Sequence, residues 1–227
     1  MTAARVRTGF QLAGELLITL GVIALLFVGY LLVWTNVRSQ AEARMLTDDL
    51  RQQWADRPHA TAGPSGGPTT PAASTQPIPD SAFAIMTIPR LGSGWYAPVI
   101  EAAGPEITLD ELAKGVVHYR GTALPGQVGN FAVAGHRATH GQPFANLDRV
   151  RAGDVVLVET ADDVYTYRVD RDPFIVLPTD LWVIGPVPGH PGVQPTQALI
   201  TLTTCNPRWN SSHRMIVFGH LIRTRVK

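Results

Sequence analysis

The sequence is short of cysteine and of net charge, and both shortages narrow what the protein can do. A single cysteine, Cys205, stands among the 227 residues, which excludes an internal disulfide framework and a cysteine-rich zinc site. Lysine and arginine number 19 against 18 aspartates and glutamates, so no basic patch of the kind that follows nucleic-acid phosphates is expected. No glycine-rich loop leads into a helix that opens with lysine, so a nucleotide cofactor is not expected either.

The composition is that of a folded chain with short elements. Hydrophobic residues make up 45% of the sequence and charged residues 16%, so the chain can bury a core. Its 21 glycines and 18 prolines favour short strands and turns over long helices. The length fits one ordinary domain with additional segments.

The N-terminal region contains one long uncharged apolar run, at residues 16–34. As a helix this run spans about 28 Å, close to the hydrocarbon thickness of a bilayer, and Tyr30 and Trp34 near its end suit the interface. The pattern predicts a transmembrane anchor at 16–34 behind a short cytoplasmic segment at 1–15. The alternative is a secretory signal peptide, because residues 41–43 (AEA) resemble a cleavage site, although the run is longer than a signal core.

Two segments separate this run from the rest of the chain. Residues 35–57 are polar, with a thin apolar stripe at Leu46, Leu50 and Trp54, and predict a juxtamembrane helix or stalk. Residues 58–79 are rich in proline, glycine, serine and threonine and bury little apolar surface. They predict a tether with a contour length of up to about 70 Å.

The remaining residues, 80–227, form one domain that reads as all-β. Only residues 108–114 suggest a helical turn or two. Seven or more short strands in one domain predict a closed barrel or a sandwich. The strands are expected at 83–88, 97–101, 130–135, 154–160, 164–170, 198–204 and 215–221.

Cys205 is expected at the end of a strand, because Pro207 shortly after it cannot continue a hydrogen-bonded ladder. A lone cysteine is more often an inert core residue than a nucleophile. Strand alternation, however, places Cys205 on the same, partly polar face as Thr201 and Thr203. Both a structural and a catalytic role stay open on this pattern alone.

His136 and Arg214 complete a chemically sensible set with Cys205. Each alone reads as a structural or solvated side chain. Together, an imidazole can take the thiol proton, and a guanidinium can stabilise the oxyanion formed when a carbonyl is attacked. The short connection between the strands of Cys205 and Arg214 predicts that these strands are neighbours and that both residues lie near the same end.

A metal site is the competing interpretation, because His136 and His140 have the i, i+4 spacing of a zinc helix. Arg137 stands where the general-base glutamate of such a helix belongs, and the flanking glycine and threonine argue against a helix, so no metal is expected. The histidines other than His136 are expected on the surface or in loops: His118, His140, His190, His213 and His220.

Several motifs in this order resemble the sortases, which are membrane-anchored cysteine transpeptidases of the Gram-positive cell surface. They are GTALPG at 121–126, GNFAVAGHR at 129–137, TLTTC at 201–205, and Arg214. The resemblance runs from about Phe83 to Leu221. It implies an eight-stranded β-barrel with the active site at its rim.

The resemblance also implies roles for individual residues. Cys205 would be the nucleophile, His136 the general acid or base, and Arg214 the donor that stabilises the oxyanion or orients the substrate, with Thr204 lining the substrate groove. The implied reaction cleaves a sorting motif of the L-P-x-T-G type between Thr and Gly on exported proteins. An amine of the peptidoglycan precursor would resolve the thioester, and no cofactor would be needed.

The subclass implied by the resemblance is class E, the housekeeping type of high-GC actinobacteria, which prefers L-A-x-T-G motifs. The motifs that indicate class E are CNP at 205–207 and HY at 118–119. Tyr119 is the candidate residue for recognising the alanine of the L-A-x-T-G motif. The enzyme would act outside the cell on a single-pass anchor. One alternative is a pilus-polymerising class C sortase. Such enzymes often carry a lid with an Asp-Pro-aromatic motif, but the DPF at 172–174 is interpreted as a turn inside the barrel. The other alternative is a tethered, non-catalytic β-barrel binding module.

Overall fold

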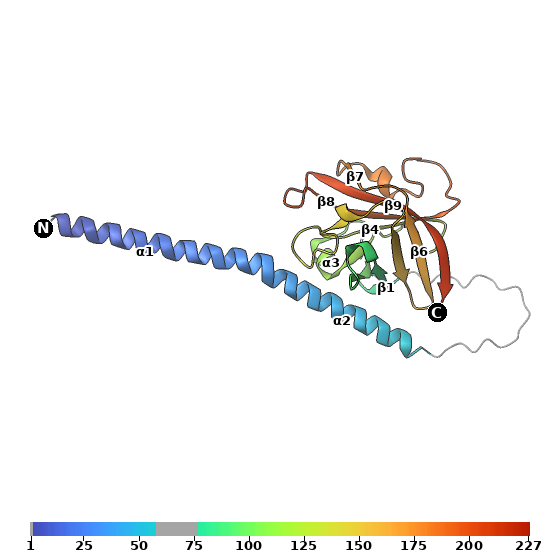
Figure 1. Cartoon of the computed structure of the whole chain (residues 1–227), viewed down its shortest axis with the longest axis horizontal. Coiled ribbons are helices and arrows are strands. Elements are labelled where there is room, and N and C mark those ends of the chain that lie inside the picture. Colours follow the sequence, from blue (N-terminus) through green and yellow to red (C-terminus); the bar gives the residue numbers. More distant parts are fainter. Residues whose placement is uncertain (1, 58–76) are drawn as a thin grey trace, which may run out of the picture.

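The computed structural model describes residues 2–57 and 77–227, and nearly all of the expected tether lies outside these residues. A long N-terminal helical arm leads to a β-barrel (Figure 1). The arm consists of α1 (Thr2–Gly29), a π-helical turn (Tyr30–Trp34) and α2 (Thr35–Ala55).

The expected transmembrane helix at residues 16–34 is not found. Among the residues described, no helix is both long enough and apolar enough to cross a membrane. The uncharged run is divided at Gly29 between α1 and the π-helical turn, so α1 carries it over only about 21 Å from Leu16.

Helix α2 covers all but the last two residues of the range 35–57 expected for a juxtamembrane helix or stalk, and it packs on the barrel. From the predicted apolar stripe, Leu50 is only 5% exposed. The ring of Trp54 lies 4.2 Å from the Nζ atom of Lys227 at the end of the last strand, and Asn36 Oδ1 accepts a hydrogen bond from the amide of Gly141 at 3.0 Å. The arm is therefore fixed to the barrel domain along α2, and Figure 1 shows it passing beneath the barrel.

Nine strands form a single sheet that closes on itself. Their hydrogen-bonded order is β6-β5-β1-β2-β3-β4-β8-β9, and a further pairing of β6 with β9 completes the ring, while β7 pairs with β9 outside it. This confirms the predicted eight-stranded barrel. The bounds are β1 Ala82–Thr87, β2 Tyr96–Glu101, β3 Val116–His118, β4 Gly129–Ala134, β5 Val155–Glu159, β6 Asp163–Val169, β7 Phe174–Val176, β8 Ala198–Asn206 and β9 His213–Val226.

Helices within the barrel domain are short. The expected helical turn is α3 (Leu109–Lys114), which begins with a capping box because the Thr108 and Glu111 side chains each accept a hydrogen bond from the other residue's backbone amide. The remaining turns are of 3-10 type, at Pro89–Leu91, Leu147–Arg149 and Leu181–Ile184.

The barrel interior is filled by side chains from facing strands. Phe131 and Val133 of β4, Leu202 of β8 and Tyr167 of β6 are fully buried in one core cluster. The Tyr167 hydroxyl accepts a hydrogen bond from the amide of Gly126 at 2.7 Å, so its polar end is satisfied. Since the interior is packed, reactive groups have room only where strands end at the rim.

Candidate active site at the ends of strands β4 and β8

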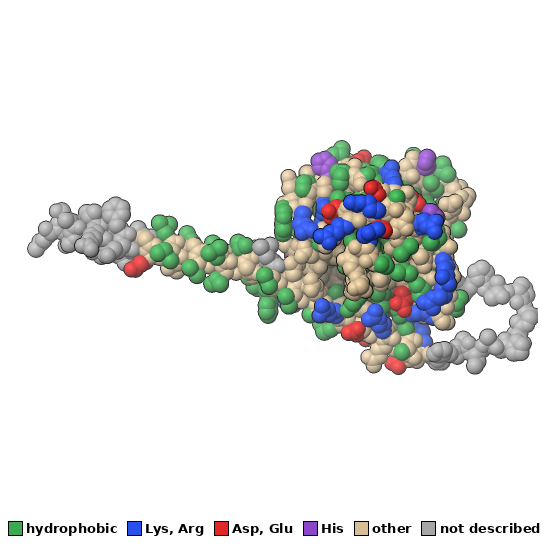
Figure 2. Space-filling model, viewed as in Figure 1, with side chains coloured by type: hydrophobic (Ala, Val, Ile, Leu, Met, Phe, Trp, Pro, Cys, Tyr) green, Lys and Arg blue, Asp and Glu red, His purple; other side chains and the backbone are tan. Residues whose placement is uncertain are grey.

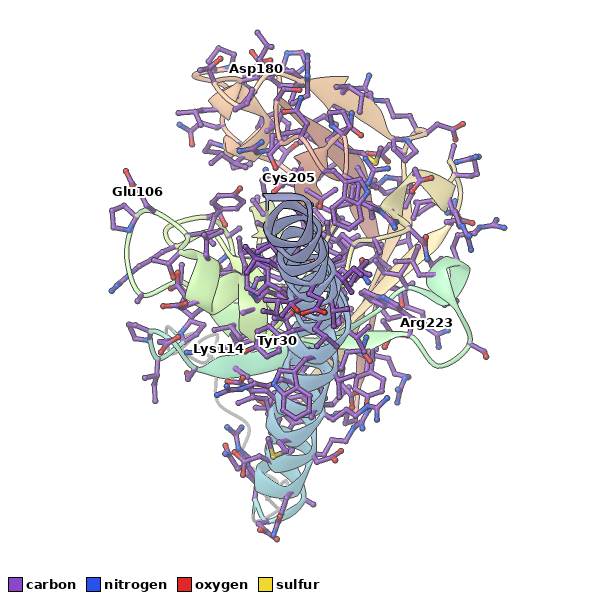
Figure 3. All side chains as sticks on the ribbon, turned by 90° about the vertical axis from the view of Figure 1, so that its left-hand side faces the viewer. Tyr30, Glu106, Lys114, Asp180, Cys205 and Arg223 are labelled. Carbon is purple, nitrogen blue, oxygen red and sulfur yellow. The ribbon has the colours of Figure 1, made fainter. Side chains whose placement is uncertain are left out.

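Cys205 and Arg214 are direct cross-strand partners. Strand β8 pairs antiparallel with β9, and the register places the two Cα atoms opposite each other. The eight-residue stretch between them folds back tightly, as the short connection predicted. The Cys205 thiol is free and half-buried, and it lies toward the upper end of the barrel in Figure 3, whereas Arg223 lies lower.

His136 is brought to the same edge by a parallel pairing of strands far apart in the sequence. Strand β4 runs beside β8, with Ala134 opposite Thr203. The pairing extends past the strand end, because the Gly135 amide donates to the Thr203 carbonyl at 3.1 Å and the Thr204 hydroxyl donates to the Gly135 carbonyl at 2.7 Å. His136 therefore follows directly on a segment held beside the residue that precedes Cys205.

The imidazole of His136 is held in its neutral form by its surroundings. Burial lowers its pKa below the ordinary value of 6.5, and the neighbouring His140, whose ring centre is 5.6 Å away, lowers it further. A hydrogen bond to the backbone of Leu109 opposes the shift. Nε2 is buried and has no hydrogen-bond partner among the described residues, so it is not committed to another group of the protein.

The lowered pKa of His136 predicts a loss of stability in acid. The unfolded chain binds a proton near pH 6.5 and the folded chain only at lower pH, so the stabilising contribution of His136 is present above pH 6.5 and is lost as the pH falls through the folded pKa. We expect the melting temperature of the wild type to fall a few degrees more between pH 7.5 and pH 5 than that of His136→Gln. The control His190→Gln, in an exposed loop, should follow the wild type; equal pH dependence of all three proteins would contradict the assignment.

Arg214 is anchored to the turn between the strands. Its Nη1 atom donates to the carbonyls of Ser211 at 2.9 Å and His213 at 3.0 Å. Both bonds use one nitrogen, so Nε and Nη2 are not committed to this turn. A guanidinium held in this way can present a second, fixed donor beside Cys205.

Tyr119, the residue that the resemblance assigned to reading the substrate, lies close to the same groups. Its hydroxyl lies 3.1 Å from Oγ1 of Thr203, two residues before Cys205. Burial raises the pKa of Tyr119, the hydrogen bond with Thr203 and the charge of Arg214 lower it, and Cys205 raises it. The phenol is therefore within electrostatic range of both the thiol and the guanidinium.

Thr204, which the resemblance assigned to the lining of the substrate groove, is buried. Its side chain is 3% exposed, and its hydroxyl is committed to the Gly135 carbonyl. Both faces of β8 are covered at this point, because Thr203 on the opposite face is also 3% exposed. The hydroxyl of Thr204 thus fixes the backbone that carries His136.

Arg137 is a residue of the site to which the sequence analysis assigned no role, although it ends the GNFAVAGHR motif at 129–137 and argues against zinc. Its guanidinium donates to Oδ1 of Asn206 and lies 3.3 Å from a carboxylate oxygen of Asp148. It therefore connects the residue after His136 to the residue after Cys205. The sequence offered only one indication of this contact: Arg137 directly follows His136, and Asn206 directly follows Cys205.

Metal ligands do not gather around this site. Within residues 2–57 and 77–227, no group of three or more histidine, cysteine, aspartate or glutamate side chains is arranged to hold a metal ion. His140 instead lines a pocket of about 320 Å³ between the barrel and α2, to which Ser39 and Arg44 of that helix contribute. Helix α2 thus borders the loop that carries His136.

The fold and the site together define a class of protein: a closed eight-stranded β-barrel that carries a cysteine, a histidine and an arginine at one rim. A family model described as the Sortase domain matches residues 86–222, and the chain belongs to the sortase family.

Two relatives come from Streptomyces coelicolor. The chain is 37% identical to Sortase SrtE1 over 219 residues, which are 94% of this chain and 57% of that protein. It is 34% identical to Sortase SrtE2 over 218 residues, 93% of this chain and 81% of that protein. The chain thus spans little more than half the length of SrtE1.

Solved structures agree with the family assignment. Sortase E from Streptomyces avermitilis superposes with a TM-score of 0.58 at 44% identity, over 66% of this chain and 93% of that one. Sortase E1 from Streptomyces coelicolor, solved with a tripeptide in its active site, gives 0.55 at 36% identity over 64% and 90%. The SrtF sortase from Corynebacterium diphtheriae gives 0.63 at 29% identity over 70% and 93%.

Proposed function

We propose that the protein is a cysteine transpeptidase of class E that joins exported proteins to a cell-wall precursor. The observation that carries the proposal is the cross-strand pairing of Cys205 with Arg214 beside the segment that ends in His136. A thiol, a neutral imidazole and a fixed guanidinium at one barrel rim are the groups that acyl transfer through a thioester requires. The sortase E relatives support the subclass.

The chemistry proceeds in two balanced steps. His136 takes the Cys205 proton as sulfur attacks the Thr carbonyl of the sorting motif, and Arg214 donates to the resulting oxyanion. The imidazolium then returns the proton to the departing glycine amine, which leaves a thioester on Cys205. An acceptor amine attacks this thioester and restores the free thiol, so the energy of the cleaved amide is kept and no nucleotide is consumed.

For the substrate we propose an L-A-x-T-G motif at the C-terminal sorting signal of exported proteins, and for the acceptor an amine of the peptidoglycan precursor. Tyr119 is the residue we assign to the alanine position, and its hydroxyl beside Thr203 supports this. Two fluorogenic peptides, L-A-x-T-G and L-P-x-T-G, test the assignment. We expect the wild type to prefer the first, and Tyr119→Phe to reduce that preference by roughly 5- to 10-fold, the effect of one lost hydrogen bond.

Two outcomes would contradict this proposal. If Tyr119→Phe leaves the ratio of kcat/KM values for the two peptides unchanged, the Tyr119 hydroxyl does not recognise the motif. If the wild type cleaves neither peptide and forms no acyl adduct by mass spectrometry, the protein is better described as a binding module.

We also propose that the domain works at the outer face of the cell membrane, with the arm as its point of attachment. The support is the exposed apolar surface of the arm: Leu16, Leu25 and Trp34 are 71%, 74% and 58% exposed, and Figure 2 shows hydrophobic side chains along it. In cell fractionation we expect the full chain with the membranes and a chain lacking residues 1–34 in the soluble fraction. Equal distribution of the two chains would contradict attachment through the arm.

A further inference from the structure

A buried histidine and glutamate lie just beneath the candidate active site, where the sequence predicted a surface histidine. His118 ends β3 and Glu101 ends β2, and the parallel register makes them direct partners. They are 1% and 3% exposed. The imidazole packs against the rings of Phe131 and Phe83, with ring centres 5.1 Å and 5.8 Å away, so the pair sits among apolar side chains.

Both ring nitrogens of His118 have hydrogen-bond partners. Nδ1 lies 2.5 Å from Oε2 of Glu101. Nε2 lies 3.1 Å from the carbonyl oxygen of Ala123 and 2.8 Å from Oγ1 of Thr122. A carbonyl oxygen only accepts, so Nε2 carries a proton and is the donor on this side.

The Thr122 hydroxyl passes this constraint on to Tyr119. It accepts from His118 and donates its own proton to the Tyr119 carbonyl at 2.8 Å, and the Thr122 amide donates to the same carbonyl at 3.1 Å. These bonds close a tight turn over residues 119–122, which requires Gly121 at φ +86°, a conformation that other residues rarely adopt. The backbone of Tyr119 is therefore held through a chain of hydrogen bonds that ends at Glu101.

The other end of Tyr119 reaches the reactive groups. Its hydroxyl lies 3.1 Å from Oγ1 of Thr203 on β8, the strand that also carries Cys205. The phenol is anchored at its ring end by Thr203. The Tyr119 backbone is held by its own amide, which donates to the Ala132 carbonyl at 2.9 Å, and by the Thr122 amide and hydroxyl. Loss of the Thr122 hydroxyl removes one of these backbone bonds and breaks the connection to His118 and Glu101.

Stability alone is a poor reason for a buried histidine–glutamate pair, because the free energy of desolvating the two groups offsets much of their attraction. We propose that Glu101, His118 and Thr122 form a positioning relay that fixes the Tyr119 phenol beside Cys205 and so sets the selectivity for the sorting motif. The selectivity part rests on the proposed function. The positioning part depends only on the geometry described above.

Removal of the Thr122 hydroxyl tests the relay. Thr122→Val keeps the shape of the side chain and removes the hydroxyl that bonds His118 and the Tyr119 carbonyl, while the bond from the Thr122 amide to that carbonyl remains. Thr122→Ser keeps the hydroxyl. The matched control is Thr160→Val in the β5–β6 turn, where the hydroxyl also donates to a backbone carbonyl, that of Asp163 at 3.2 Å. If Thr122→Val does not fold, Glu101→Gln is the second test, because it changes the first residue of the relay and keeps the shape of its side chain.

The first readout needs no activity. The phenol of Tyr119 titrates above its ordinary pKa of 10 because it is buried, and carbon-13 labelling of tyrosine Cζ, assigned with Tyr119→Phe, follows it by NMR. We expect Thr122→Val and Glu101→Gln to move its titration midpoint toward 10, with Thr122→Ser and Thr160→Val unchanged. An unmoved midpoint in a folded Thr122→Val or Glu101→Gln protein overturns the relay.

The second readout is the ratio of kcat/KM for L-A-x-T-G over L-P-x-T-G peptides. We expect Thr122→Val to lower it about fivefold and Thr122→Ser to restore it. A moved midpoint with an unchanged ratio overturns the role in selectivity but keeps the positioning. A wild type that cleaves neither peptide overturns the proposed function, and the NMR titration still decides whether the relay holds Tyr119.

Discussion

Cys205→Ala is expected to abolish peptide cleavage and the acyl adduct together. The chain has no other cysteine, so no second thiol can form the thioester. Loss of a covalent nucleophile lowers kcat by at least about 10⁴-fold in comparable enzymes. Stability should change by less than about 1 kcal/mol, because the side chain is small and half-buried at the end of a strand.

The measurement combines fluorogenic cleavage with mass spectrometry of the intact protein. The wild type should gain the mass of the acyl fragment, and Cys205→Ala should not, with both proteins melting at the same temperature. Cys205→Ser is the matched variant, because it keeps an oxygen nucleophile that is far less reactive at neutral pH. Wild-type turnover in Cys205→Ala would exclude the thioester mechanism and leave the binding module as the better description.

Most strands of the barrel could be predicted because their burial follows a simple pattern. Strand β5, for example, alternates between buried and half-buried residues over five positions, and the turn after it ends the run clearly. Strands β3 and β7 were missed because each has only three residues, too few to show a period. The DPF at 172–174 was interpreted as a turn for the same reason, although Phe174 begins β7.

The burial of His118 could not be predicted from the sequence. Beside a tyrosine and a glycine–threonine pair, His118 looks like a loop residue. Its burial depends on Glu101, which lies seventeen positions earlier and becomes a neighbour only through the parallel pairing of β2 with β3. Neither composition nor spacing encodes such a pairing.

In the candidate active site, too, one contact could be predicted from the residues and another could not. The pairing of Cys205 with Arg214 follows from a short connection between antiparallel strands, so it could be predicted from the residues. The approach of His136 depends on the parallel β4–β8 pairing, in which Gly135 and Thr204 are 69 positions apart, and only the family resemblance indicated it. The docking of α2 could not be predicted, because an apolar stripe predicts a helix but not the surface it covers.

Arg214→Lys is expected to lower kcat by roughly 10² to 10³, although the charge is kept. Nη1 of Arg214 is used by the carbonyls of Ser211 and His213, while Nε and Nη2 of the same planar group can serve an oxyanion beside Cys205. A lysine has a single nitrogen, so it either bonds the turn or turns toward the substrate. The loss should fall on kcat and not on KM, because the oxyanion exists only after attack.

The control for this variant lies on the same strand. Arg223→Lys makes the same exchange on β9 beyond the site, at an exposed position, and should leave kcat and KM at wild-type values. If both variants turn over like the wild type, charge alone suffices and the fixed fork has no role. If Arg214→Lys instead raises KM at constant kcat, the guanidinium binds the substrate and does not stabilise its transition state, so oxyanion stabilisation must come from another donor at the rim.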